Sequence, residues 1–380
     1  MTWILLRRPC RAATLPGSGG GARGNGGWWN CHAGDATRRD AARRGEAGTR
    51  GRPGLTACGL STRDRIEEFM AEERRPVRPA PSGTRHTVPG ALLADLRGAR
   101  HSHPGELAAV LASWSLRPLT GGRNNDVYAW DGICVKLYRR TDRNRVEREW
   151  HGLRHVAELG VAPRPLWFDE HPSRPALGMT LVPGSPADEG VFPPALLTDL
   201  AGATRAMQAL PLTEPLAAMA RVDSIARYVA RLTDEWPVQL SEAPGDEHTP
   251  QMLTLLRRWR AGNDACLLAQ PAPKVFSRGD ANLLNWLHHH TGLHVVDFEF
   301  AGFSDPAVDA ADHVEHISAC HVPDACWFPL TEAFGDRDRA RFDAARRTIA
   351  LRWLAVLWKQ RGHRPHEFLR QLDRVRTLLA

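Results

Sequence analysis

The chain has very little lysine. Three of its 50 basic residues are Lys, at positions 136, 274 and 359, and all the others are Arg. Because the chain uses Arg wherever either cation will serve, a Lys inside an ordered segment suggests a need for the compact ammonium group. Lys136 stands in such a segment, the apolar run at 132–138. The alternative is a Lys on the solvent-facing side of an alternating strand, which is the more common case for a single Lys.

The chain also lacks long apolar runs and paired cysteines. No apolar stretch approaches the roughly 20 residues that cross a bilayer, and residues 2–6 are too short for the core of a signal peptide. Its seven Cys are scattered, with no Cys-x-x-Cys pair. This pattern disfavours a disulfide framework or a zinc site and favours reduced thiols. We therefore predict a cytoplasmic protein that does not associate with membranes.

The positive charge belongs to the N-terminal segment. The formal net charge is +7, yet residues 1–85 contain 16 Arg against 8 Asp and Glu, so the rest of the chain is close to neutral. The rest has no basic stripe, and we expect no nucleic-acid binding there. Residues 1–60 are rich in Gly and Arg without periodicity, which predicts disorder. They are either a basic RNA-binding arm or, as we prefer, a mobile tail or a segment upstream of a true translation start at Met70. With the Pro-rich linker that follows, the tail spans residues 1–89.

From about residue 90 the pattern changes to short strands and then to helices. The turn Asp131-Gly132 joins two strand-like runs and is a strong hairpin signal. The predicted strands are 116–120, 126–130, 133–138, 162–169 and 176–182, and the predicted helices are 107–114, 143–159, 194–210, 220–236, 250–269, 305–319, 338–359 and 365–379. We predict an α+β protein with an antiparallel β lobe at 90–184 and a larger, mainly helical lobe at 185–380.

Three oxygen-bearing side chains lie close together in the sequence, at Asp280, Asn285 and Asp297. The stretch from Asn285 to Asp297 has the pattern of a tight hairpin, which brings its two ends together. Oxygen ligands that meet in this way can hold a Mg²⁺ ion that also carries phosphates. Asp280, on the loop before the hairpin, is placed to orient an attacking hydroxyl. This division of labour is the one that phosphoryl transfer requires.

Lys136 supplies the cation that such a site needs. A Lys ammonium fits between phosphate oxygens as a point charge. A charged group in an apolar strand also needs a partner, and the following helix offers Glu147 and Glu149. We favour Glu149, which lies one helical turn before the apolar Leu153. The preceding Gly121-Gly122 pair allows the backbone to approach a phosphate, although such a pair is more often a simple hairpin turn.

With these residues in place, the chain resembles the aminoglycoside phosphotransferase and choline kinase superfamily, relatives of the protein kinases. The resemblance covers residues of about 115–320, and its most specific motif is an Asp, an Asn five residues later and an Asp after a hairpin. It implies that Asp280 is the catalytic residue and that Asn285 and Asp297 are the Mg²⁺ ligands. It also implies a two-lobe, protein-kinase-like fold.

The same resemblance implies an ATP site in the β lobe. Lys136 matches the phosphate-binding Lys of the family, and Glu149 matches its helix partner. The remaining implied nucleotide-binding residues lie in the loop before the second strand and in the segment that contacts the base: Gly121, Gly122, Asn125, Met179 and Leu181.

One residue departs from the family pattern. The family usually has His before the Gly-Asp of the catalytic loop, and here this residue is Arg278. The His is expected to brace the loop with hydrogen bonds, and an Arg can also donate several. We further expect Arg278 to lower the pKa of Asp280 and to keep this carboxyl ionised.

The sequence therefore predicts a kinase that moves the γ-phosphate of ATP to a hydroxyl of a small molecule that is aminoglycoside-, choline- or sugar-like. The alternative is a nucleotide-binding pseudokinase that regulates a partner, which only Arg278 supports. A protein kinase is disfavoured, because the seven residues between Asp297 and position 305 leave no room for an activation segment. The sequence does not encode the identity of the acceptor in a form that we can interpret.

A few other side chains allow two interpretations. His288 to His290 form either a metal site or, as we expect, an exposed hairpin turn. His313 and His316 are either ligands or, preferably, a pair on a helix surface. The charged residues Asp312 and Glu315 face either a cationic acceptor or the solvent. Trp353 and Trp358 belong either to an aromatic cage or, preferably, to the core.

Overall fold

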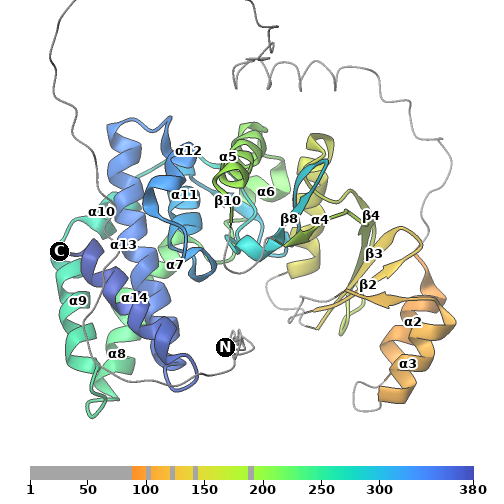
Figure 1. The fold of residues 1–380 in the computed structure, drawn as a ribbon, viewed down its shortest axis with the longest axis horizontal. Coiled ribbons are helices and arrows are strands. Elements are labelled where there is room, and N and C mark those ends of the chain that lie inside the picture. The colour runs from red at the N-terminus through yellow and green to blue at the C-terminus, as the bar shows by residue number, and fades with distance from the viewer. Residues whose placement is uncertain (1–87, 100–103, 120–124, 140–143, 187–191) are drawn as a thin grey trace, which may run out of the picture. The chain divides into compact units, whose positions relative to one another are not determined.

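The structure is a computed structural model that describes residues 88–99, 104–119, 125–139, 144–186 and 192–380 (Figure 1). Residues 1–87 of the predicted tail at 1–89 lie outside these residues, as do Gly121 and Gly122. In the described part of the chain, no helix is both long and apolar enough to cross a membrane.

The first part of the described chain is a five-stranded antiparallel sheet in the order β1-β2-β3-β5-β4. Its strands are β1 (Arg117–Pro118), β2 (Asn125–Trp130), β3 (Ile133–Tyr138), β4 (Pro165–Asp169) and β5 (Ala176–Thr180). The β2–β3 turn has positive φ at both Asp131 and Gly132, as a two-residue hairpin requires. The predicted five strands are therefore confirmed, although β1, β4 and β5 are shorter than we expected.

The two faces of the sheet have different neighbours. Alternate side chains of β3 point to opposite faces, so Val135 and Leu137 enter an apolar core with the helix α2 (Gly90–Gly98). Figure 1 shows α2 and α3 (Pro104–Ser113) beside the sheet. Lys136 and Tyr138 take the other face, toward α4 (Arg145–Val156). The sequence did not predict α2, whose buried face has only three Leu.

Helices dominate from residue 194 onward, and α13 packs against α10, α11 and α14 (Figure 1). The helices are α5 (Pro194–Ala209), α6 (Glu214–Ala218), α7 (Ile225–Ala230), α8 (Trp236–Ser241), α9 (Thr249–Ala261), α10 (Asp264–Ala269), α11 (Pro306–Glu315), α12 (Phe328–Thr331), α13 (Asp336–Lys359) and α14 (Pro365–Leu378).

Three predicted helices differ from the structure. The predicted helix at 220–236 begins later, at α7, because Ser224 caps it by accepting a hydrogen bond from the Arg227 amide. The predicted helix at 250–269 is two helices, since the chain is extended at Gly262. The predicted helix at 305–319 ends at Glu315, because the backbone is extended at His316, and a separate short 3-10 turn follows at Ile317–Ala319.

Short strands in the helical part carry the residues of the predicted site. Strand β7 (Val275–Ser277) pairs with β10 (Gly302–Ser304), and β8 (Trp286–His289) pairs with β9 (Gly292–Val295) and with β6 (Ser185–Pro186). The β8–β9 pairing confirms the predicted hairpin. The loop from 278 to 285 joins β7 to β8, and Asp297 follows β9, so both segments emerge at the same place.

Candidate active site

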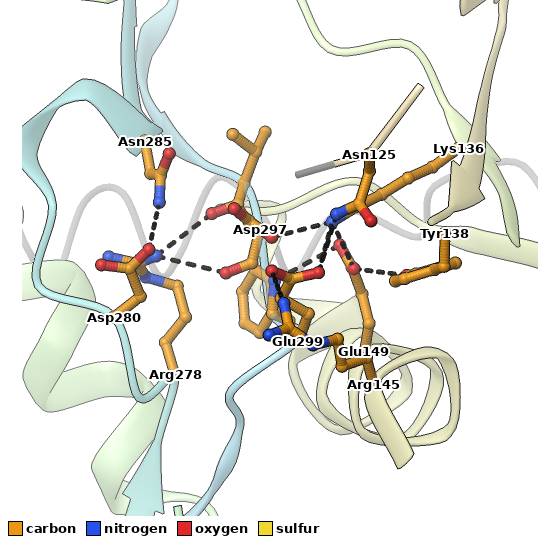
Figure 2. A network of polar contacts seen from close by, with 12 residues as sticks. Asn125, Lys136, Tyr138, Arg145, Glu149, Arg278, Asp280, Asn285, Asp297 and Glu299 are labelled. Atoms are coloured by element: carbon orange, nitrogen blue, oxygen red, sulfur yellow. Dashed lines mark hydrogen bonds and ion pairs between the residues drawn. The ribbon is translucent and has the colours of Figure 1, made fainter. Parts of the chain in front are cut away.

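Lys136 is the centre of a buried ion cluster between the sheet, α4 and the segment after β9 (Figure 2). Its Nζ lies 2.6 Å from Glu149 Oε2 and 2.7 Å from Asp297 Oδ1. Glu149 is held in turn by the Tyr138 hydroxyl and by the Phe298 amide. Burial opposes the charge of Lys136, but the neighbouring carboxylates outweigh it and raise the pKa of this ammonium. The strand Lys is therefore paired with Glu149, the partner that the sequence favoured.

Glu299 is a member of this cluster that sequence reasoning missed. It is fully buried and accepts hydrogen bonds from Arg145 at 2.6 Å and Asn125 at 2.7 Å, while Lys136 Nζ lies 3.9 Å away. The cluster thus holds two cations against three carboxylates. Burial, and then the charge of Asp297, raise the pKa of Glu299 to about 7. Its place two residues after Asp297, between two Phe, was the available signal, because an acid in an apolar run needs partners.

Asp297 combines an unusual backbone with a stabilised charge. Its φ of 69° lies in the left-handed region, which non-glycine residues rarely adopt outside functional or tightly held positions. Burial alone would raise the pKa of this carboxyl, but the charge and hydrogen bond of Lys136 reverse the effect and lower it. Asp297 is therefore ionised and half-exposed, which suits a ligand for a hard cation.

Asp280 is fixed on the loop by two hydrogen bonds (Figure 2). Its Oδ1 accepts from the Asn282 amide and its Oδ2 from Asn285 Nδ2, both at 2.9 Å. Burial raises the pKa of Asp280, and the charge of Arg278 only partly offsets this. We expected Arg278 to lower this pKa, and its charge does act in that direction, but desolvation of the carboxyl is the larger effect.

Arg278 braces the loop against the segment that carries Asp297. Its Nη1 donates to the carbonyls of Val296 at 3.3 Å and Asp297 at 3.2 Å (Figure 2). Next to it, Gly279 has a φ of +79°, and a Cβ there would lie 2.2 Å from the Phe300 carbonyl oxygen. The loop thus needs Gly at this position, and the Arg provides the hydrogen bonds that we expected of it.

The hairpin brings Asn285 next to the segment of Asp297. The Val296 amide donates to the Asn285 carbonyl at 3.0 Å, directly beyond the paired residues Trp286 and Val295. Because Asn285 Nδ2 is bonded to Asp280, its Oδ1 is the atom left to act as a ligand. These two residues therefore offer a carboxylate and an amide oxygen at one end of the hairpin.

The remaining predicted nucleotide-binding residues occupy the sheet. Asn125 begins β2, and its buried side chain turns to Glu299. Met179 is buried in β5, and Leu181 follows this strand with an exposed side chain. The amide of Leu181 donates to the Gly132 carbonyl at 3.0 Å, so a base would have to bond to other backbone atoms of this segment.

Helix α11 and the turn after it are more buried than the sequence suggested. Asp312 is bonded to Arg221, and Glu315 accepts hydrogen bonds from two Arg side chains of α13 and α14. His313 and His316 are also buried, so the predicted surface pair is wrong. Neither carboxylate therefore faces the solvent, because each neutralises Arg charges inside the helical part.

For the two Trp residues of α13 and for the three consecutive His residues, the structure agrees with the interpretation that we preferred. Trp353 and Trp358 are buried, as core residues are. His288 to His290 occupy the hairpin tip, where the side chains are exposed or half-exposed. Among the residues that the structure describes, the one group of acidic, His or Cys side chains close enough to share a metal ion is Glu149, Asp297 and Glu299.

Most of the described chain matches a known protein family. The phosphotransferase enzyme family matches residues 115–357. The chain belongs to this family. The match includes the sheet, the ion cluster and the loop of Asp280, and α2 and α3 precede it. A comparison with curated proteins found no match to this phosphotransferase family member.

Solved structures share the fold. A choline/ethanolamine kinase family protein from Mesorhizobium loti is 19% identical, covers 76% of this chain and 95% of its own, and has a TM-score of 0.53. The aminoglycoside phosphotransferase APH(4)-Ia is 17% identical, with coverage of 72% and 96% and a TM-score of 0.51. The streptomycin–ATP complex of APH(2")-IIa is 15% identical, with coverage of 72% and 96% and a TM-score of 0.50. The predicted two-lobe, kinase-like fold is therefore confirmed.

Proposed function

We propose that this phosphotransferase moves the γ-phosphate of ATP to a hydroxyl of a small molecule, with Mg²⁺. The observation that supports this most is the convergence of residues from distant segments. Lys136 Nζ lies 2.7 Å from Asp297 Oδ1, and Asn285 Nδ2 lies 2.9 Å from Asp280 Oδ2. A cation for phosphates, two oxygen ligands and a carboxylate for the attacking hydroxyl are the parts that phosphoryl transfer needs.

In this proposal Lys136 binds the α- and β-phosphates of ATP. Its partner Glu149 is buried and held by three groups, so the ammonium is kept in one position. An ammonium fixed in this way acts as a point charge for phosphate oxygens. The ATP complex among the solved relatives agrees with ATP as the donor.

The residues around Asp297 fit a Mg²⁺ ion. Asp297 is ionised and half-exposed, and the Oδ1 atom of Asn285 is directed away from its bond to Asp280. Carboxylate and amide oxygens are the ligands that this ion prefers. Asp297 and Asn285 would hold the ion, whose charge would offset the negative charge that develops on the phosphates.

Asp280 would orient the acceptor hydroxyl and accept its proton. Two hydrogen bonds fix the carboxylate, so it is already oriented before the acceptor binds. The raised pKa makes it a better proton acceptor than an ordinary Asp.

The deciding experiment is ATP turnover by Asp280→Asn across a panel of hydroxylated acceptors. The change keeps the shape of the side chain and leaves one oxygen that can accept the hydrogen bond from Asn285 Nδ2, but it removes the carboxylate that accepts the proton. Turnover should fall by about 10²- to 10⁴-fold, with ATP affinity little changed, because Lys136 is held by Glu149 and Asp297. The matched control is Asp338→Asn, which removes an exposed carboxylate at the start of α13.

The same experiment separates the kinase from the pseudokinase. If wild type and Asp280→Asn bind ATP equally and neither consumes it with any acceptor, the chain is a nucleotide-binding module and the enzyme proposal fails.

A further inference from the structure

A small cavity lies beside Asp280. Its volume is about 20 Å³, enough for one water-sized group. Its walls come from α5, β7, the loop of Asp280, the start of β8 and α11. The cavity therefore touches the carboxylate that would accept the proton, on the side of the helical part.

Four buried polar atoms of residues that line this cavity have no hydrogen-bond partner among the described residues. They are Arg278 Nη2, Trp286 Nε1, His313 Nδ1 and Thr204 Oγ1. None of these residues is more than 7% exposed. A buried polar atom without a partner is costly, and folded proteins contain few of them. Four around one cavity indicate that a bound group supplies the missing hydrogen bonds.

These four atoms select for a group that accepts hydrogen bonds. The guanidinium of Arg278 and the indole of Trp286 can only donate. His313 is uncharged, because burial, reinforced by the charge of Arg278, lowers its pKa to about 3. Its Nδ1 and the Thr204 hydroxyl can each donate or accept. An oxygen atom is therefore the best match for the cavity.

The carboxylates nearby leave no place for a cation. Arg221 binds both Asp309 and Asp312, and the Ser277 hydroxyl donates to Asp309 at 2.5 Å. Only Asp280 remains, and it is assigned to the reacting hydroxyl. An ammonium group in the cavity would instead meet the positive charge of Arg278, which is unfavourable at close range.

We propose that this cavity binds an uncharged hydroxyl of the acceptor, next to the hydroxyl that is phosphorylated, and that the acceptor is a neutral polyol of the sugar type. This rests on the proposed kinase function. The reaction itself is unchanged: the acceptor oxygen bonds to the γ-phosphorus as the bond to ADP breaks, and the hydroxyl proton passes to Asp280.

The first test compares matched pairs of acceptors with ATP. Glucose is set against glucosamine, other polyols against their amino-deoxy analogues, and kanamycin and choline complete the panel. The neutral member of a pair should have a kcat/KM at least about tenfold higher, because the ammonium lacks an acceptor for the donors in the cavity. A preference for the cationic members overturns the inference and leaves the kinase proposal intact.

The second test removes one hydrogen-bonding group at a time from the residues that line the cavity. Thr204→Val keeps the shape and breaks no hydrogen bond within the described protein, so the unfolding temperature should not fall. The KM for the best neutral acceptor should rise about tenfold, with the KM for ATP unchanged. An unchanged acceptor KM contradicts the inference, because a purely structural Thr204 would give that result.

Trp286→Phe removes the indole donor in the same way. Its matched control is Trp236→Phe in α8, which also removes a buried indole N–H without a described partner but does not line the cavity. Both should lose similar stability, and only the Trp286 change should raise the KM for the acceptor. Equal effects on KM contradict the inference.

A binding measurement keeps the two proposals apart. If no acceptor is phosphorylated, the kinase proposal fails, and the same panel is tested for its effect on the unfolding temperature. Stabilisation by neutral polyols that Thr204→Val abolishes supports the cavity assignment. Stabilisation by the cationic compounds, or by none, overturns it.

Discussion

At the scale of single residues, Arg278 links the two halves of the candidate site. Its Nη1 atom donates to the carbonyls of Val296 and Asp297, and its Nη2 atom has no hydrogen-bond partner among the described residues. Its charge also acts on Asp280, where it opposes the effect of burial. The residue that departs from the family pattern thus both shapes the loop and tunes its carboxylate.

This role predicts the pH dependence of Arg278→Gln. Asp280 must be ionised to accept a proton, so kcat/KM falls as the pH drops through its pKa in the free enzyme. Burial raises this pKa and Arg278 lowers it. Removing the positive charge should therefore move the acidic limb of the kcat/KM profile to higher pH, by about one unit. Arg278→Lys keeps the charge and should leave the limb in place. Coincident profiles for Gln and Lys would contradict the electrostatic argument.

Some of these residue contacts could be predicted from the sequence and some could not. The pairing of Lys136 with Glu149 followed from a rare Lys in an apolar strand and an acidic residue 13 positions later on the next helix. The bonds of Glu299 to Arg145 and Asn125 join residues 154 and 174 positions apart. No local pattern specifies such pairs, because they depend on how the sheet and the hairpin meet.

At the scale of elements, a close contact fixes β4 on β5. The Trp167 ring lies across Gly178, its neighbour in the sheet, and a Cβ on Gly178 would be 2.1 Å from Trp167 Cε2. The φ of Gly178 lies outside the left-handed region, so the backbone conformation does not require a glycine there. The glycine is needed because a larger side chain would collide with the Trp167 ring. By contrast, a Cβ added to Gly202, in the middle of α5, would have no other atom within 4 Å.

These two glycines predict opposite effects of the same substitution. Gly178→Ala should destabilise the protein by about 1–3 kcal/mol, because the Trp167 ring must move. Gly202→Ala should stabilise it by about 0.5–1 kcal/mol through the higher helix propensity of Ala. Denaturant unfolding with an unchanged m-value measures both. A loss of stability at both positions would show that space is not the cause.

Local signals explain which elements could be predicted. The turn at Asp131-Gly132 and the hairpin before Asp297 follow from short-range patterns, and both are present. The break at Gly262 and the late start of α7 depend on helix capping and on packing against α13. The spacing of apolar residues along the sequence does not show either of these effects. Helix α2 gains its stability from the sheet core rather than from its own pattern.

At the scale of the molecule, α4 attaches the sheet to the helical part. Arg148 donates to the carbonyls of Ala220 at 2.9 Å and Ala301 at 2.8 Å. Gly152 allows close packing, since a Cβ there would lie 3.0 Å from the Ala301 Cβ. Together with the pair of Arg145 and Glu299, these contacts hold the elements of the site in one body.

The contacts that the structure describes for the candidate site join residues between Asn125 and Glu299, and we expect the N-terminal segment to be dispensable. Residues 81–380 form one compact unit. A chain that begins at Pro81 should keep the unfolding temperature, the ATP affinity and the turnover of the full chain. A clear loss of ATP affinity on truncation would show that the segment takes part in the site.

The burial of the Lys136 cluster has a consequence for the response to dissolved salt. Ions in solution weaken attraction between exposed charges over a Debye length of about 8 Å at physiological ionic strength, but they do not enter a buried contact. The pair of Arg376 and Asp373 on α14 is exposed and is screened in this way. Lys136, Glu149 and Glu299 are shielded from it. The chain therefore keeps the Lys136 ammonium in place in dilute and in concentrated electrolyte alike.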